Sequence, residues 1–140
     1  SEVVSKKIET FDDSPKGEAV VIKTFKNQTE QQTYLLDEIK SLTREQGIYP
    51  EQILVLLNTG KAESCLAATT KAGKLEIKAL DNKGRFQKGA INYTTINTFK
   101  GLEADIVFIV DVNEIPLKQK HEKLYTEASR AKHKLYVLAS

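Results

Sequence analysis

Apolar residues along this chain fall into short uninterrupted runs that are separated by amphipathic or polar stretches. The clearest runs are Ile53 to Leu57 and Ile106 to Asp111, which are apolar throughout except at the final Asp. Such runs are typical of strands that a parallel sheet buries on both faces. Apolar and β-branched residues predict four further strands, over Ala19 to Phe25, Leu75 to Ala79, Ala90 to Ile96 and Leu135 to Ala139.

Helical spacing is clearest over Gln28 to Gln46. Leu35, Ile39 and Leu42 form one apolar stripe, and Gly47 is a natural stop. A capping box is available from Asn27 with Glu30, or from Thr29 with Gln32.

Further helices are expected over Lys61 to Lys71 and Leu117 to His133, with a short turn or helix over Thr98 to Glu103. Asp81, Asn82 and Gly84 predict a tight turn or a hairpin. Apolar strands that alternate with helices indicate an α/β fold of three layers around a mostly parallel sheet. We expect an irregular lead-in or added segment over residues 1–16 and one domain over residues 17–140.

Composition narrows the class of protein. With 140 residues and a formal net charge of +2, the chain can form one domain with a buried core, but it is too short for a motor of two stacked domains. Basic residues outnumber acidic ones from Pro116 onward. The single Cys65 excludes an intramolecular disulfide, and a structural buried thiol is its commoner role.

No apolar run approaches the length of a membrane span, and the first residues do not have the pattern of a secretion signal. We therefore expect a cytoplasmic protein without a membrane partner, and no metal site of its own. The chain contains no Met, so we expect the natural protein to extend beyond it.

In a parallel α/β fold, ligands bind at the carboxyl ends of strands, so the loop after Leu57 is a first candidate. Its Gly60-Lys61 pair suggests a phosphate-binding loop. That motif needs Gly where this chain has Val55, and Ser or Thr where it has Ala62. We therefore reject a Walker A loop here and favour a plain strand-to-helix turn.

A second candidate is the string from Thr95 to Glu103. Lys100 and Gly101 after a strand bring a cation and backbone N–H groups to one place, which suits an anion, and Glu103 could accept a hydrogen bond from a sugar hydroxyl. Taken alone, a simple turn with a solvated Lys100 explains this string better.

A third candidate is Arg130, which small residues surround in the string from Leu124 to Lys132. These small neighbours would let its guanidinium reach a phosphate. Taken alone, a surface Arg in a salt bridge explains it better.

The two strings together resemble motifs V and VI of superfamily 1 DNA helicases of the UvrD/Rep/PcrA type. The chain has Thr-Ile-x-x-x-Lys-Gly-Leu-Glu before an apolar strand, and then Tyr-x-x-x-Ser-Arg-Ala-Lys before a terminal Leu-Tyr-Val-Leu strand. The order of the motifs and the strand between them agree with the family. A weaker likeness reaches upstream to Gly17.

This resemblance implies the second RecA-like domain of an ATP-driven motor on single-stranded DNA. By analogy Arg130 is the arginine finger at the γ-phosphate of ATP, Glu103 binds the ribose, and Lys100 and Gly101 lie near the phosphates. The remaining implied contacts, to DNA or to the neighbouring domain, are Asn58, Thr59, Thr95 and Asn97.

The chain departs from the family at three motif positions: Asn97 replaces His, Ser129 replaces Thr and Lys132 replaces Arg. The Walker A loop, the magnesium-binding acid and the motif IV Arg would lie before Ser1, in a first RecA-like domain that binds most of the ATP and Mg²⁺. The large accessory domain of full-sized relatives is also missing.

Two functions remain open. The first is the motor half of a helicase, which alone would not hydrolyse ATP. The alternative is a non-catalytic RecA-like module that binds nucleic acid or protein. A phosphoacceptor receiver domain is rejected, because Asp12 and Asp13 do not end a strand and no Asp follows Leu57.

Overall fold

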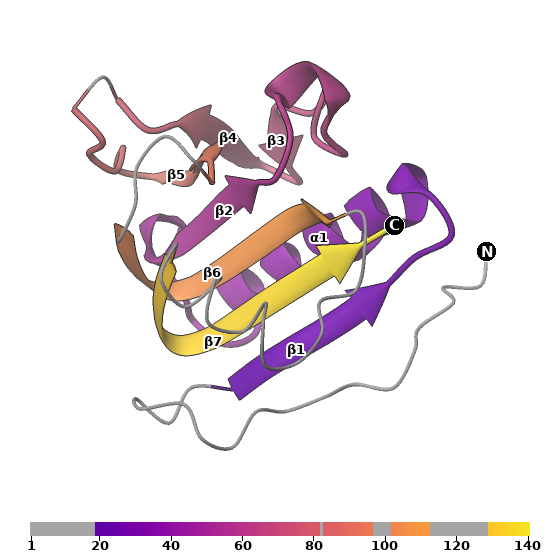
Figure 1. Cartoon of the computed structure of the whole chain (residues 1–140). Helices are drawn as coiled ribbons and strands as arrows, with labels where there is room; N and C mark the ends of the chain where they lie inside the picture. Colours follow the sequence, from indigo (N-terminus) through magenta and orange to yellow (C-terminus); the bar gives the residue numbers. More distant parts are fainter. Residues whose placement is uncertain (1–18, 82, 97–101, 113–128) are drawn as a thin grey trace.

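The computed structural model describes residues 19–81, 83–96, 102–112 and 129–140 (Figure 1). In chain order the elements are β1 (Ala19–Thr24), α1 (Gln28–Arg44), the 3-10 turn η1 (Pro50–Gln52), β2 (Ile53–Leu57), the 3-10 turn η2 (Lys61–Glu63), β3 (Lys71–Ala72), β4 (Leu75–Ala79), β5 (Ala90–Thr95), β6 (Leu102–Val112) and β7 (Ser129–Ala139). No helix in the described ranges is long and apolar enough to cross a bilayer.

The strands form one sheet in the order β1-β7-β6-β2-β5-β4-β3. All neighbouring pairs are parallel except β3 and β4, which are antiparallel. The predicted α/β class with a mostly parallel sheet is confirmed. The neighbouring strands β1, β7, β6, β2 and β5 all run in the same direction. Their carboxyl ends therefore lie along one side of the sheet, which we call the carboxyl edge, and their amino ends lie along the opposite side, which we call the amino edge.

Strand β2 is central, and all five of its residues are buried. Ile53, Val55 and Leu57 belong to the core cluster that includes the apolar stripe of α1, whereas Leu54 and Leu56 belong to the cluster on the opposite face. Alternate side chains of a strand point to opposite faces, so a continuous apolar run fits a strand that is covered on both sides. In Figure 1, α1 lies behind the sheet.

Helix α1 begins and ends as the sequence predicts, with small differences. Asn27 is the N-cap, and its Oδ1 accepts a hydrogen bond of 2.9 Å from the backbone N–H of Glu30. This bond satisfies one of the N–H groups that the first turn leaves unpaired. At the other end the last helical residue is Arg44, and Gly47 has a positive φ of 72° just beyond it.

A hydrogen bond from the sheet fixes α1 against it. Tyr136 Oη, on β7, donates to Glu38 Oε2 on α1 at 2.5 Å. The Tyr136 ring stacks on Phe108 with centroids 4.1 Å apart. Burial, and then the hydrogen bond to Glu38, raise the pKa of Tyr136 well above its usual range, so the phenol stays a donor.

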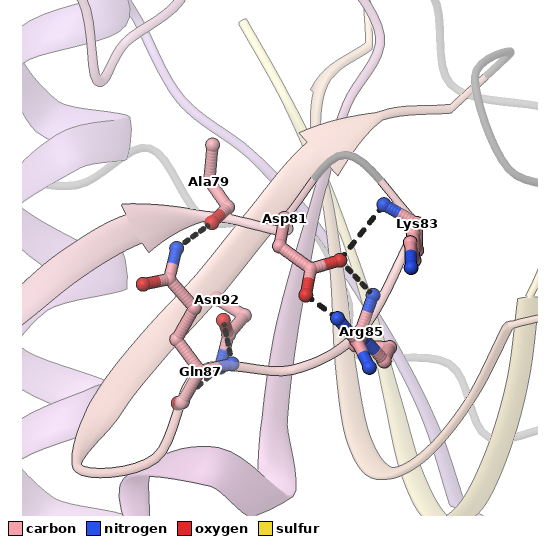
Figure 2. Close-up of polar contacts among 6 residues, drawn as sticks. All are labelled: Ala79, Asp81, Lys83, Arg85, Gln87 and Asn92. Atoms are coloured by element: carbon pink, nitrogen blue, oxygen red, sulfur yellow. Dashed lines mark hydrogen bonds and ion pairs between the residues drawn. The ribbon is translucent and has the colours of Figure 1, made fainter.

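The turn that begins at Asp81 is confirmed, but it does not form a hairpin, because β4 and β5 are parallel. Figure 2 shows the Asp81 carboxylate accepting from the backbone N–H groups of Lys83 and Arg85 and from Arg85 Nε, at 2.9, 2.8 and 3.0 Å. Further along the connection, buried Asn92 accepts from Gln87 N–H at 2.8 Å and donates to Gln87 O at 3.2 Å. Side-chain amides and carboxylates therefore replace the ladder bonds that this connection lacks.

The helix predicted over Lys61 to Lys71 is wrong. The segment forms only the short η2 turn, followed by irregular turns up to β3. Ser64 Oγ and Cys65 N–H both donate to the carboxylate of Asp111, at 2.6 and 2.8 Å. A buried carboxylate that binds these two groups competes with the hydrogen bonds a helix would need.

The helix predicted over Leu117 to His133 is wrong at its end, because β7 already begins at Ser129. Residues 113–128 lie outside the described residues. Arg130, which was expected on a helix, is therefore on a strand. Likewise Leu102 and Glu103, expected in a short turn or helix, begin β6. Pairing between the two strands, and burial of Ala131 in the core, outweigh local helical propensity here.

Candidate functional site

The carboxyl edge brings together three of the predicted nucleic-acid contacts. Thr95 is the Cα partner of Leu57, and Asn58 and Thr59 follow Leu57 directly. Two backbone bonds tie the strand ends together, from Ile96 N–H to Leu57 O at 2.9 Å and from Asn58 N–H to Val110 O at 3.1 Å. Asn97, the fourth predicted contact, lies outside the described residues.

Asn58 and Thr59 are accessible, but neither is a strongly charged group. The side chain of Asn58 is exposed, and its Nδ2 is 3.5 Å from Asp111 O, the limit of a hydrogen bond. Thr59 Oγ1 donates to the neighbouring Gly60 O at 3.1 Å. These groups could contact a phosphate or a base edge, which suits contacts that do not depend on sequence.

The loop after Asn58 is unlike a phosphate cradle. A Cβ placed on Gly60 would lie 2.8 Å from Glu63 Oε1, so a carboxylate occupies the space above this glycine. Lys61 Nζ turns to Ala67 O at 3.2 Å, within its own loop. An acid and an engaged lysine do not favour a triphosphate, which agrees with the rejection of a Walker A loop from the sequence.

Asp111 is the centre of the carboxyl edge, and the sequence analysis did not name it as a site residue. It is 3% exposed and has a positive φ of 65°. Besides Ser64 and Cys65, it contacts Gln31, because its backbone N–H donates to Gln31 Oε1 at 2.7 Å. Two signals could have identified this pair: an acid that ends an apolar run, and Gln31, which is on the buried stripe of α1 one turn before Leu35.

Polar atoms without partners gather near this edge. Among the described residues, the buried side-chain atoms with no hydrogen bond are Thr24 Oγ1, Glu30 Oε1 and Gln31 Nε2. Thr24 ends β1 and the other two are in the first turn of α1. Such groups destabilise a fold unless something satisfies them.

Cys65 is buried beside Asp111, as expected for a structural thiol. Burial, and then the negative charge of Asp111, raise the pKa of its thiol above the usual range. The neutral thiol is a poor nucleophile, so Cys65 fits packing rather than catalysis.

The amino edge brings together the two motifs that the sequence placed far apart. Glu103 of β6 and Arg130 of β7 are Cα partners in the parallel ladder. Strand neighbours lie about 4.8 Å apart, so both backbones present their residues at one place. Lys100 and Gly101, the other predicted ATP contacts, lie outside the described residues.

Exposed ion pairs line this edge. Glu103 Oε1 lies 3.1 Å from Lys132 Nζ, and both side chains are about half exposed. The hydrogen bond that Lys132 donates to Glu103 raises the pKa of Lys132. Next to this pair, Asp105 Oδ2 accepts from Gln52 Nε2 at 2.5 Å, and Asp105 Oδ1 lies 3.8 Å from His133 Nε2. Charged groups that face solvent can exchange a protein partner for a ligand at small cost.

Known proteins are similar to this chain in both sequence and fold. The sequence model of the family described as UvrD-like helicase C-terminal domain matches residues 91–138, which include nearly all of β5, β6 and β7. No curated protein matches the chain significantly. The fold is similar to the crystal structure of the C-terminal domain of a possible DNA helicase from Lactobacillus plantarum WCFS1. The TM-score is 0.56 with 22% sequence identity, over 87% of this chain and 73% of that one.

At this identity the structural likeness shows the fold, while the family match identifies a sequence pattern over residues 91–138. The matched residues include both motif strings, with Glu103 and Arg130 within them. The resemblance predicted from those strings is therefore confirmed: residues 91–138 match the sequence model of the UvrD-like helicase C-terminal domain, on an α/β sheet of similar fold.

Proposed function

We propose that this chain is the carboxyl-terminal motor domain of an ATP-dependent DNA helicase or translocase, and that Arg130 is its arginine finger. The observation that carries the proposal is the register of β6 and β7, which makes Glu103 and Arg130 Cα partners. A cation for a phosphate and an acceptor for a sugar hydroxyl are the two groups that one nucleotide requires.

Arg130 would stabilise the charge that develops on the γ-phosphate during transfer to water. Glu103 would accept a hydrogen bond from the ribose, and about half of its side chain is exposed. ATP supplies the energy for translocation when it binds, together with Mg²⁺, mainly to a first RecA-like domain upstream of Ser1. Lys100 and Gly101 remain predicted contacts to the phosphates.

Single-stranded DNA would contact the carboxyl edge, at Asn58, Thr59 and Thr95, with Asn97 as a further predicted contact. The nucleotide and these particular DNA contacts would then lie at opposite edges of one sheet. Strands that connect both edges can transmit a change at one to the other, which suits a motor.

The test is Arg130→Ala in a chain that includes the upstream motor domain. We expect ATP turnover with saturating single-stranded DNA to fall on the order of a thousandfold, the size of effect typical of an arginine finger. Arg85→Ala is a matched control, because it removes an exposed arginine that pairs with Asp81 in a turn and belongs to neither motif. We expect it to leave turnover unchanged.

Near-normal turnover of Arg130→Ala would contradict the proposed role. The 140-residue chain alone should show no magnesium-dependent hydrolysis, and measurable hydrolysis by the pure chain would contradict the division of labour between two domains. An upstream sequence without an intact Gly-x-x-x-x-Gly-Lys-Thr/Ser loop would favour the alternative, a non-catalytic binding module.

A further inference from the structure

A pocket of about 450 Å³ lies between the end of α1 and the turn that joins β3 to β4. Its lining residues, which define what we call the basic pocket, are Lys40, Thr43, Arg44, Gly47, Ile48, Tyr49, Pro50, Ala72, Lys74 and Leu75. The volume is within the range of small-molecule sites and is large enough for a nucleotide unit. None of the residues implied by the two motifs lines it.

The charge of the basic pocket has one sign. Lys40, Arg44 and Lys74 line it, and no acidic residue does. Across the described ranges, neither Arg44 nor Lys74 is in an ion pair. Lys40 Nζ is 3.6 Å from Asp37 Oδ1, but the Asp37 side chain is 68% exposed, so this pair is weak and an anion can replace it.

The backbone places these cations together. Gly73, at the turn between β3 and β4, has a positive φ of 65°. A Cβ placed on it would lie 3.3 Å from both Arg44 Nη2 and Lys40 Cδ. The two side chains of α1 therefore lie across the turn, directly beside Lys74.

The carboxyl end of a helix carries partial negative charge, and here two of the last four carbonyls are already bonded. Glu45 N–H donates to Ser41 O at 2.9 Å, and Ile48 N–H donates to Leu42 O at 3.0 Å. These bonds reduce the negative charge that the helix end presents, and the cations at Lys40, Arg44 and Lys74 outweigh what remains.

Tyr49 gives the basic pocket an aromatic group. Its side chain is 70% exposed, and it is the one large hydrophobic residue of the described ranges that is exposed. Its backbone is held in place, because its N–H donates to Gln52 Oε1 at 2.7 Å. An exposed aromatic ring next to cations is a combination that binds single strands, since bases stack on the ring while phosphates pair with the cations.

We propose that the basic pocket binds a phosphodiester segment of single-stranded nucleic acid, with phosphate at Arg44, Lys74 and Lys40 and a base on Tyr49. The identification of the ligand as nucleic acid rests on the proposed function. The site itself is inferred from the pocket and its charges, not from either motif. Gln52 links Tyr49 to Asp105, so the basic pocket lies along the amino edge of the sheet with the Glu103–Lys132 pair. It would be a second nucleic-acid contact, in addition to the one proposed at the carboxyl edge.

The experiment measures binding of fluorescein-labelled oligodeoxythymidine to the 140-residue chain by anisotropy, over a series of salt concentrations. The test variant is R44Q/K74Q, and the matched control is K26Q/K88Q, which removes the same charge from two exposed lysines outside the pocket. We expect at least a tenfold loss of affinity for R44Q/K74Q, with a shallower salt dependence, and less than a twofold loss for the control.

Tyr49 is tested separately. Tyr49→Ala should weaken binding roughly 5- to 100-fold, and Tyr49→Phe should restore it, because stacking needs the ring and not the hydroxyl. Far-UV circular dichroism and the thermal midpoint establish that each variant is folded. Neither Tyr49 nor Arg44 is in the buried core, so these changes should leave both unaltered.

Three results would overturn the inference: no binding of the oligonucleotide, equal losses for R44Q/K74Q and K26Q/K88Q, or competition by inorganic phosphate or ADP as effective as that by unlabelled oligonucleotide. The last result would assign the pocket to a free phosphate compound. If any of these three results is found while ATP turnover still depends on Arg130, the basic pocket does not bind nucleic acid but the proposed motor function is retained.

Discussion

The two edges of the sheet are built in opposite ways, although the same strands form both. At the carboxyl edge, Asp111 is buried and its carboxylate and backbone contact Ser64, Cys65 and Gln31. At the amino edge, the Glu103 and Lys132 side chains are about half exposed and pair in solvent. Buried hydrogen bonds to a carboxylate stabilise a fold strongly, whereas exposed pairs contribute little.

The charged groups of the two edges therefore have different roles: buried Asp111 stabilises the fold, whereas the Glu103–Lys132 pair faces solvent. The carboxyl edge uses the buried carboxylate of Asp111 to hold the loop after β2 in place. The amino edge leaves its charged groups open to exchange with a ligand. We therefore expect substitutions at the carboxyl edge to act first on folding, and those at the amino edge to act first on binding and turnover.

The largest effect on stability should come from Asp111→Ala. It leaves the Ser64 hydroxyl and the Cys65 N–H buried without an acceptor, and it puts Ala at a positive φ. We expect the free energy of unfolding to fall by about 3 kcal/mol, measured by urea denaturation. Asp111→Asn should retain most of the stability of the parent chain, because Asn keeps a hydrogen-bond acceptor and tolerates this φ.

Asp105→Ala is the matched control, since it makes the same change on the same strand at the other edge. Asp105 is 22% exposed and accepts one hydrogen bond, from Gln52. Its loss should cost about 1 kcal/mol or less. Equal losses at Asp105 and Asp111 would refute the contrast between the edges.

The carboxyl edge also illustrates what sequence reasoning can reach. The apolar run of β2, the Asn27 cap and the stripe of α1 depend on neighbours in sequence, and these predictions were confirmed. Asp111 and Gln31 are 80 residues apart, so no local pattern predicts their contact. The same contact network explains why the segment after Lys61 is not a helix.

At the amino edge the local structure predicted for the motif residues was wrong, while their roles stay predictions. Arg130 was expected on a helix, because Ala and Lys around it favour one. Instead β7 continues to Ser129 and pairs with the first residues of β6, which is a contact between distant segments. That pairing gives Arg130 and Glu103 their common position, which only the structure reveals.

Gln31→Met should have a smaller effect than Asp111→Ala. The substitution removes the acceptor for Asp111 N–H, but it also removes Gln31 Nε2, a buried donor that has no partner among the described residues. The two effects oppose each other, so we expect a loss of about 1 kcal/mol in urea denaturation. A gain in stability would mean that the unsatisfied donor outweighs the bond, and a loss as large as that of Asp111→Ala would contradict this balance.

The smallest effect concerns the pH dependence of the Glu103–Lys132 pair. Glu103 raises the pKa of Lys132 in the folded chain, so the pair stabilises the fold fully below the unfolded pKa of about 10.4 and loses this contribution as pH rises through the folded pKa. The difference in thermal midpoint between the parent chain and Lys132→Gln should therefore be slight at neutral pH and vanish above that range. Taking the difference cancels the titration of the other lysines and tyrosines.

Lys132→Arg, which restores the residue usual in the family, should keep the contribution at high pH, because a guanidinium stays protonated there. If the difference between the parent and Lys132→Gln curves does not change through this range, the titration of Lys132 contributes nothing to folding, which would contradict this prediction.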